Sequence, residues 1–388
     1  MKYNQNFFKL SGDYVFSELS KKVAKKRLDS KTEIIDLGIG DVRLPLFDCV
    51  ISAMQSACRE MGTANGFKGY PPAQGYAFLR EKISQSYQRL GTKISADEVF
   101  ITDGAKGQLG SITELFDKKI RVLFPTPCYP AGAEANIFLG NEVELLPTSR
   151  QDGFIPYPPP SKDYDLIYLC SPNNPTGATL SHSELKLWVD YALSCGSVII
   201  FDGAYSSFVS GDLPRSIYEI SNAKHCAIEI CSFSKSLGFT GIRCGYTVIP
   251  NELGRLNELW KRRISSRFNG VSYISQRGAE AFFSPEGIKA TQKRINFYKT
   301  NAEILKIALK NLNLWYNNTV CSPYVFGECP NGVSSGDFCD RLLDELSIVA
   351  TPGTGFLKGG EGFFRLSAFS KREQILNASD RLRSLKTN

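Results

Sequence analysis

The chain has 388 residues, of which 42% are hydrophobic, and its formal net charge is +7. This length suffices for two domains with a sizeable core, and the lack of an apolar run of about 18 residues argues against a membrane-spanning helix. The first eight residues lack the apolar core of a signal peptide, and the eleven cysteines form no Cys-x-x-Cys pair. We therefore expect reduced thiols and a cytoplasmic protein without a membrane partner.

The basic residues and the histidines suggest two other classes of function. The densest basic clusters, at 21–27 and 261–263, fall on helix-like stretches, where a solvated helix face explains them. No helix-turn-helix or zinc pattern accompanies them, so we expect no nucleic-acid partner. The only histidines, His182 and His225, are too few and too far apart for a metal site, so we expect no metal.

Strand-like and helical patterns alternate from about residue 97 to 250. The helical patterns lie near 106–117, 183–194 and 252–267. Short apolar runs rich in β-branched residues predict seven strands, at 99–102, 121–124, 143–146, 166–169, 198–201, 227–231 and 246–249. This alternation predicts an α/β fold with a mostly parallel central sheet and helices on both of its faces.

The chain from about residue 271 has a different pattern. Long helical stretches at 275–283 and 287–310 come first, and shorter strand-like pieces follow. This order is typical of a smaller α+β domain. We found no internal repeat, low-complexity tract or flexible linker in the sequence.

A polar run directly after the predicted strand at 227–231 combines a lysine, two hydroxyls and an arginine, namely Lys235, Ser232, Ser234 and Arg243. A lysine amine forms a Schiff base with an aldehyde, while hydroxyl and guanidinium donors suit a phosphate dianion. These groups together fit an aldehyde that carries a phosphate, so Lys235 is a candidate for a pyridoxal phosphate lysine. The alternative for this run alone is a polar surface turn.

Two other predicted strands end in groups that this cofactor needs. Asp202 follows the strand at 198–201 and can keep a pyridine nitrogen protonated, with the Tyr205 phenol close by to hydrogen-bond the cofactor's 3-oxygen. Asn174 follows the strand at 166–169 and can donate to the same oxygen. An aspartate after a strand is often only a helix cap or a loop residue. Three strand ends that each deliver a different required group favour a cofactor site with Lys235, Asp202 and Tyr205 as catalytic residues.

These motifs carry a family resemblance. Asn-Asn-Pro-Thr-Gly at 173–177, Asp-x-x-Tyr at 202–205, Ser-x-Ser-Lys at 232–235 and Gly-x-Arg-x-Gly at 241–245 together resemble the fold-type I, pyridoxal phosphate-dependent aminotransferases of class I/II. Further segments are similar to those of the LL-diaminopimelate aminotransferase family, at 36–45, 69–75, 78–81, 103–106 and 364–369. The likeness covers nearly the whole chain.

The resemblance implies an architecture and a reaction. It implies a large cofactor-binding domain at 39–270, and a small domain made of 1–38 and 271–388, with an N-terminal arm that reaches a partner subunit. The implied assembly is a homodimer with shared active sites. The implied reaction is a transamination that interconverts LL-2,6-diaminopimelate plus 2-oxoglutarate and tetrahydrodipicolinate plus glutamate. It belongs to the biosynthesis of lysine and of peptidoglycan precursors.

The resemblance also assigns roles to further residues. For the cofactor it implies contacts from the backbone N–H groups of Gly104, Ala105 and Lys106 at the start of a helix. It also implies that the ring of Tyr129 stacks on the cofactor, that Tyr70 reaches it from the other subunit, and that Asn269 contacts it. For the substrate it implies that Arg365 grips the α-carboxylate. The other implied substrate contacts are Tyr14, Gly40, Lys106, Tyr129, Asn174 and Asn269.

One position departs from the family pattern. The family commonly has a glutamate just before the glutamine of the segment at 69–75, and here Ala73 stands in its place. This loss of a partner for the substrate's distal ammonium leaves a broad-specificity aspartate or aromatic aminotransferase as an alternative. A non-catalytic cofactor-binding regulator is a further alternative, which the lack of a DNA-binding module disfavours.

Overall fold

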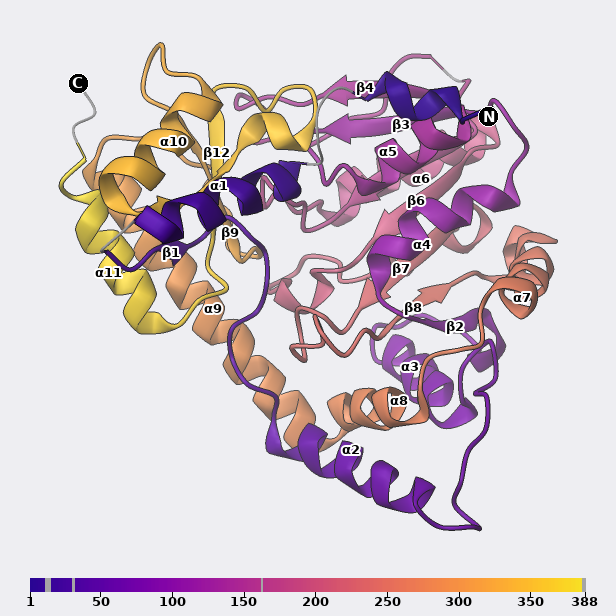
Figure 1. Ribbon diagram of the computed structural model, residues 1–388. Coiled ribbons are helices and arrows are strands. Elements are labelled where there is room, and N and C mark those ends of the chain that lie inside the picture. Colours follow the sequence, from indigo (N-terminus) through magenta and orange to yellow (C-terminus); the bar gives the residue numbers. More distant parts are fainter. Residues whose placement is uncertain (11–14, 30–31, 162, 386–388) are drawn as a thin grey trace.

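The computed structural model describes residues 1–10, 15–29, 32–161 and 163–385. Figure 1 shows two units: a large sheet with helices on both sides, and a smaller unit of helices and short strands that contains α9, α10 and α11. The long helix α9 (Pro285–Asn311) runs from the helices beneath the large sheet into the smaller unit. The two units therefore share one continuous helix.

The central sheet contains all seven predicted strands. Its spatial order is β2 (Val99–Thr102), β8 (Gly245–Val248), β7 (Ala227–Ser232), β6 (Val198–Asp202), β5 (Leu166–Cys170), β3 (Arg121–Thr126) and β4 (Glu142–Pro147). In this sheet β8 runs antiparallel to both of its neighbours, β2 and β7, and the other neighbouring strands pair in parallel. The predicted fold class, a mostly parallel α/β sheet, is confirmed.

The strands read as apolar runs because both faces of the sheet are covered. In β5, Leu166 and Tyr168 belong to one buried cluster, while Ile167 and Leu169 belong to another. The first cluster packs against α4 (Ala105–Ser111), α5 (Ala131–Leu139) and α7 (Leu256–Arg267). The second cluster packs against α3 (Ala77–Gln88) and α6 (His182–Cys195).

A helical layer extends beneath the sheet in Figure 1. It consists of α2 (Asp48–Met61), α3 and α8 (Tyr273–Glu280), and α8 packs against both of the others. The 3-10 helix η8 (Ala281–Phe283) leads from α8 into α9. The segment that follows residue 270 therefore still packs on helices of the large unit before the chain enters the smaller one.

The smaller unit holds two short sheets and three further helices. A three-stranded sheet has the order β11 (Thr351–Pro352), β12 (Phe363–Ser367) and β9 (Tyr324–Glu328). A two-stranded parallel sheet pairs β1 (Ile35–Asp36) with β10 (Ile348–Val349). The helices are α1 (Val15–Asp29), α10 (Ser335–Leu346) and α11 (Arg372–Leu382).

The N-terminal region contacts both units. Leu19 and Val23 of α1 pack against Leu343 and Val349 of the smaller unit. The 3-10 helix η1 (Gln5–Lys9) lies instead on α5 of the large unit, where the Phe7 ring stacks on Phe138 with the centroids 4.1 Å apart. Within one chain, then, residues 5–9 lie with the large unit, and α1 and β1 lie with the smaller one.

Three further observations concern membrane helices, cysteines and metal-binding groups. No helix among the residues described has the length and apolar character needed to cross a membrane. All eleven cysteines are free thiols. Across the described ranges, no group of three or more His, Cys, Asp or Glu side chains is arranged to hold a metal ion.

Candidate active site

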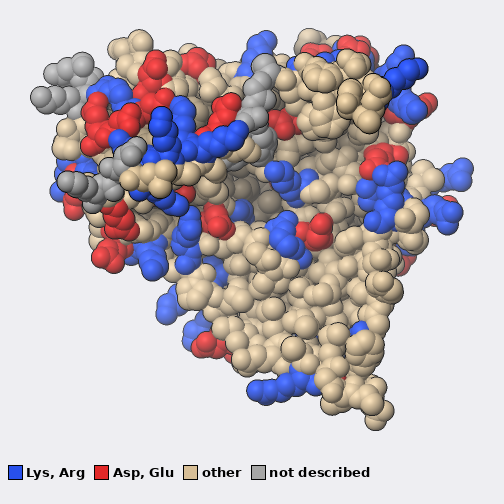
Figure 2. Space-filling model, viewed as in Figure 1, with Lys and Arg blue, Asp and Glu red and all other residues tan. Residues whose placement is uncertain are grey.

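A cavity of about 390 Å³ lies where the loops after the central strands face the smaller unit. Figure 2 shows a hollow near the centre of this face, with Lys and Arg side chains beside it. Most of the residues that the sequence indicated line the cavity, namely Gly40, Ala105, Lys106, Tyr129, Asn174, Asp202, Tyr205, Ser232, Ser234, Lys235, Arg243 and Arg365.

The parallel strands explain why these side chains meet. Asp202 is the last residue of β6, Ser232 is the last residue of β7, and Asn174 follows four residues after β5. The carboxyl ends of parallel strands lie at one edge of a sheet, so the groups that follow them converge there. Residues far apart in the sequence are in this way assembled into one site.

Among the residues that the structure describes, Lys235 and Lys106 are the two lysines that line the cavity. Its Nζ donates a hydrogen bond to the carbonyl of Gly40 and lies 5.5 Å from the centroid of the Phe369 ring. Burial lowers the pKa of the Lys235 amine from 10.5 to about 8, Asp41 acts in the opposite direction, and the cations of Arg365 and Arg243 lower it further. A large fraction of this amine is therefore neutral and nucleophilic at mildly alkaline pH.

Asp202 is a buried carboxylate, with 8% of its surface exposed. Its Oδ1 accepts a hydrogen bond of 3.0 Å from the backbone N–H of Ala204. Burial raises the pKa of Asp202 to about 6, against the hydrogen bonds from Ala204 and Cys170, which lower it. Within the described part of the chain, no Lys, Arg or His forms an ion pair with this carboxylate.

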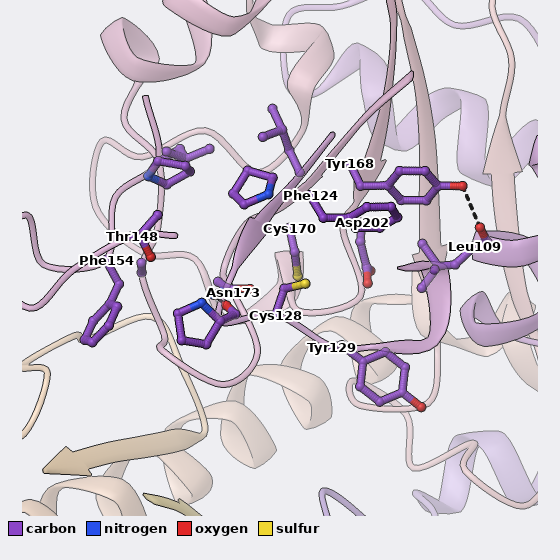
Figure 3. A pocket seen from close by; sticks show the side chains of 17 residues that line it. Leu109, Phe124, Cys128, Tyr129, Thr148, Phe154, Tyr168, Cys170, Asn173 and Asp202 are labelled. Carbon is purple, nitrogen blue, oxygen red and sulfur yellow. Dashed lines mark hydrogen bonds between the residues drawn. The ribbon is translucent and has the colours of Figure 1, made fainter. Parts of the chain in front are cut away.

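A smaller cavity of about 50 Å³ lies behind Asp202 (Figure 3). Its wall includes the side chains of Cys128 and Cys170, whose sulfurs point toward one another in this view. It also includes Tyr168, whose hydroxyl donates to the carbonyl of Leu109 over 2.7 Å. Burial raises the pKa of both thiols, so the two cysteines are neutral neighbours of Asp202. Asp202 thus borders an uncharged, largely apolar wall.

The phenol of Tyr205 is held by a second tyrosine. Its oxygen lies 2.8 Å from the hydroxyl oxygen of Tyr324, which begins β9 in the smaller unit. Gly40 passes so close to Tyr324 that a Cβ atom at this position would lie 2.2 Å from the hydroxyl oxygen. Only glycine therefore fits at position 40 while Tyr324 keeps this place.

Arg365 is almost fully buried and makes several contacts in the cavity wall. One guanidinium nitrogen donates to Oδ1 of Asn174 over 2.6 Å, and another donates to the carbonyl of Gly38. The guanidinium carbon lies 4.3 Å from the centroid of the Tyr324 ring. The bond to Oδ1 fixes the orientation of the Asn174 amide, so that its NH₂ group is the end available to a ligand.

The phosphate-binding candidates lie together at one end of the cavity. Arg243 adopts a positive φ of 64° and donates to Ser234 Oγ over 3.5 Å and to the carbonyl of Thr240 over 3.1 Å. Gly104, with φ of 110°, caps α4, and a Cβ there would lie 2.4 Å from the Arg243 guanidinium. The glycine therefore lets the arginine approach the start of the helix, where backbone N–H groups are free of intrahelical partners.

Two of the indicated residues lie away from the cavity of their own chain. Tyr70 is 88% exposed, and Asn269 is also exposed. They lie on adjoining loops, because a Cβ at Gly270 would lie 2.7 Å from the carbonyl of Pro72. Gly104 does not itself line the cavity but precedes Ala105, which does. The remaining candidate, Tyr14, lies outside the described residues.

The structure adds residues that the sequence did not single out. Asp41 lines the cavity, and its Oδ1 is buried without a hydrogen-bond partner among the described residues. Tyr324 and Thr240 line it as well. Asp41 stands inside the Gly-Ile-Gly-Asp segment, so its position was visible in the sequence although its role was not. Nothing in the sequence around Tyr324 distinguishes it as a site residue from the other tyrosines, of which the chain has 17 in all.

Comparison with known proteins places this geometry in a family. The family model for aminotransferase class I and II matches residues 32–382. LL-diaminopimelate aminotransferases from Bacteroides fragilis and from Prochlorococcus marinus subsp. pastoris are each 44% identical to the chain, over 98% of the chain and over 98% and 99% of their own lengths.

Among solved structures, L,L-diaminopimelate aminotransferase from Chlamydomonas reinhardtii superposes with a TM-score of 0.92 at 36% identity, over 98% of both chains. The matched region of the family model includes every residue of the cavity wall discussed above. The chain therefore belongs to the class I and II aminotransferase family.

Proposed function

We propose that the protein is a pyridoxal phosphate-dependent aminotransferase that transfers an amino group between LL-2,6-diaminopimelate and 2-oxoglutarate. The products are glutamate, tetrahydrodipicolinate and water, since the 2-amino-6-oxo acid left by amino transfer cyclises with loss of water. The observation that carries this proposal is a single cavity lined by the amine of Lys235, the carboxylate of Asp202 and the guanidinium of Arg365. The similarity to LL-diaminopimelate aminotransferases over 98% of the chain supports the choice of substrate.

The cavity fits this cofactor on three counts. Asp202 is buried without a cationic partner in the described residues, and a protonated pyridine nitrogen would supply one. Arg243, Ser232 and Ser234 lie beside the start of α4, which suits a phosphate dianion. Lys235 has a depressed pKa and can condense with an aldehyde at its neutral amine.

The roles of the chain's own residues follow from these positions. Asp202 would hold the proton on the ring nitrogen, and Asn174 and Tyr205 would donate to the 3-oxygen, with Tyr324 fixing Tyr205. When bound, pyridoxal phosphate supplies an electron sink for the carbanion that forms as the substrate loses its α-proton. Lys235 Nζ would take that proton from the α-carbon and deliver it to the cofactor's C4′, for which a pKa near 8 is well suited.

Arg365 would hold the substrate's α-carboxylate. Its guanidinium is nearly buried and is stacked on Tyr324, so its plane is fixed before the substrate arrives. A planar fork matches a carboxylate with two hydrogen bonds, which a lysine cannot reproduce. Lys106, which lies 5.9 Å from the centroid of the Tyr129 ring, is the cation in the wall best suited to the distal carboxylate of diaminopimelate.

The site would be completed by a second copy of the chain. Tyr70 and Asn269 are exposed on adjoining loops and do not line the cavity of their own chain. In a homodimer, Tyr70 of the partner subunit would reach the phosphate, and Asn269 would act at the same boundary. Eleven free thiols fit the reducing cytoplasm as the place of action.

A second candidate is a broad-specificity aspartate or aromatic aminotransferase. Ala73 favours it, because a methyl group cannot pair with the distal ammonium of diaminopimelate. In its own chain Ala73 packs at the edge of the apolar cluster beside α4. The two candidates make the same use of Lys235, Asp202 and Arg365, and they differ only in how the far end of the substrate is held.

The two candidates separate in a comparison of amino donors. Purified protein would be mixed with 2-oxoglutarate and with LL-diaminopimelate, meso-diaminopimelate, aspartate or phenylalanine, and glutamate formation would be followed. We expect the highest kcat/KM with LL-diaminopimelate, and a larger loss with that donor than with aspartate in Lys106→Ala. Equal or higher kcat/KM with aspartate or phenylalanine would establish the second candidate, and no glutamate from any donor would refute both.

A further inference from the structure

Cys170 lies directly beside Asp202 at the end of the central sheet. It is the last residue of β5, and it pairs in register with Asp202, the last residue of β6. Residues paired in this way on neighbouring parallel strands place their side chains on the same face of the sheet. Both side chains line the cavity of about 50 Å³ in Figure 3, whereas of the two only Asp202 also lines the larger cavity. Cys170 therefore reaches the active site through Asp202.

The thiol of Cys170 has one proton and two acceptors within reach. Its Sγ donates to the carbonyl of Pro172 over 3.3 Å, and it also hydrogen-bonds the carboxylate of Asp202. The carboxylate has room for this bond, because its oxygens offer about four lone pairs and the N–H of Ala204 uses one of them. Rotation of the S–H bond about the Cβ–Sγ axis therefore selects between the two acceptors.

The other titratable groups around Asp202 are neutral or lie in the larger cavity. Burial raises the pKa of the neighbouring thiols and phenols, which are those of Cys128, Cys231, Tyr205 and Tyr324. The cations that line the larger cavity are Lys106, Lys235, Arg243 and Arg365. Burial also raises the pKa of the Cys170 thiol, so this group keeps its proton, and remains a donor, over the pH range in which Asp202 titrates.

We propose that Cys170 is a positioning residue for Asp202, whose thiol donates to the ionised carboxylate and turns to the carbonyl of Pro172 when the carboxyl is protonated. A hydrogen bond to a charged acceptor is roughly twice as strong as one between neutral groups, which favours the ionised form. The inference rests on the proposed function, in which Asp202 faces a protonated ring nitrogen. There the thiol lowers the proton affinity of the carboxylate, so that the proton stays on the nitrogen.

Matched substitutions of Cys170 in the cofactor-free protein test this role. Cys170→Ser keeps a donor, Cys170→Ala removes it, and Cys170→Val removes it while filling the space. Protein labelled with ¹³C at the aspartate carboxyl carbons would be titrated by NMR, and the signal lost in Asp202→Asn identifies Asp202. We expect a midpoint near 6 in the wild type and in Cys170→Ser. It should rise by about one pH unit in Cys170→Ala and Cys170→Val, through the loss of a hydrogen bond to a charged group.

Cys128→Ala is the control for the space that a sulfur atom occupies. Cys128 lines the same cavity, and the hydrogen bonds that lower the pKa of Asp202 come from Ala204 and Cys170 instead. The midpoint in Cys128→Ala should therefore stay close to that of the wild type. Three results would each overturn the proposal: an unchanged midpoint in both Cys170→Ala and Cys170→Val, equal rises in Cys128→Ala and Cys170→Ala, or the same rise in Cys170→Ser as in Cys170→Ala.

The cofactor-loaded protein then tests whether the thiol acts on the ring nitrogen. Pyridoxal phosphate labelled with ¹⁵N at this atom has a chemical shift that changes when the nitrogen loses its proton. We expect the value of a protonated nitrogen in the wild type and in Cys170→Ser. In Cys170→Ala it should move toward the unprotonated value, with kcat about tenfold lower and KM little changed. An unchanged chemical shift in Cys170→Ala would refute the role at the cofactor.

The two experiments separate this inference from the proposed function. The carboxyl titration needs no cofactor, so its outcome does not depend on whether the protein is an aminotransferase. A protein that takes up no pyridoxal phosphate, but whose Asp202 midpoint rises in Cys170→Ala and not in Cys170→Ser, would refute the proposed function and support the bond between Cys170 and Asp202.

Discussion

Asp202→Asn should make the cofactor-free protein more stable, and it should abolish the activity of the cofactor-loaded protein. Burial raises the pKa of this carboxyl from 3.8 to about 6, so its ionised form is disfavoured in the folded chain. At about 1.36 kcal/mol per pH unit, this corresponds to roughly 3 kcal/mol of lost stability whenever the group is charged. An asparagine carries no charge and can keep the bond from the N–H of Ala204.

The sign and the pH window follow from linkage. Since the pKa is higher in the folded state, the contribution of Asp202 to stability is fully present below pH 3.8 and is lost as the pH rises through about 6. The increase in the free energy of unfolding of the variant over the wild type should therefore be small near pH 4 and level off above pH 6 at about 3 kcal/mol. Urea denaturation of the cofactor-free proteins at a series of pH values measures this difference directly.

Two comparisons make the result decisive. Asp212→Asn changes an exposed carboxylate, and the free energy of unfolding of this control should stay close to that of the wild type across the same pH range. In the cofactor-loaded state the wild type should be more stable than Asp202→Asn, because only the aspartate can hold a protonated ring nitrogen. A variant that is no more stable than the wild type at pH 8 without cofactor would refute the assignment of Asp202 as an uncompensated buried charge.

Further predictions concern the other parts of the site. The rate at which cofactor-free protein captures pyridoxal phosphate should rise with pH about a midpoint near 8, since only neutral Lys235 reacts; a midpoint near 10.5 would contradict the lowered pKa. Arg365→Lys should lower kcat/KM roughly 10- to 100-fold through the loss of one charged hydrogen bond, and unchanged kinetics would remove Arg365 from the substrate site. Gly40→Ala should lower activity because the new Cβ would lie 2.2 Å from the Tyr324 hydroxyl, and adding Tyr324→Phe should restore part of it; no recovery would show that the clash is not the cause. Mixed refolding of Tyr70→Ala with Lys235→Ala chains should give about one quarter of wild-type activity, because half of the dimers carry one intact site, and mere addition of the parent activities would exclude shared sites.

The central sheet could be predicted from the sequence because its strands are covered on both faces. Continuous apolar runs such as Leu166–Cys170 therefore stand out from the polar loops around them. The candidate site residues at the ends of β5, β6 and β7 could be singled out from the sequence for the same reason, since each follows such a run. The smaller unit was harder to predict because β1, β10 and β11 have only two residues each, too few for a periodic pattern.

Contacts between the two units could not be read from the sequence. Tyr324 lies on β9 of the smaller unit, and its bond to Tyr205 exists only because the two units meet.

The measurement that tests the central claim most directly is the location of the covalently bound cofactor. Purified protein would be reduced with borohydride, digested, and searched by mass spectrometry for the peptide that carries the reduced pyridoxyl phosphate. The structure predicts the label on Lys235, the lysine whose amine is buried in the active-site cavity and has a pKa lowered to about 8. A label on Lys106 or on any lysine outside the cavity, or no label at all, would contradict the assignment.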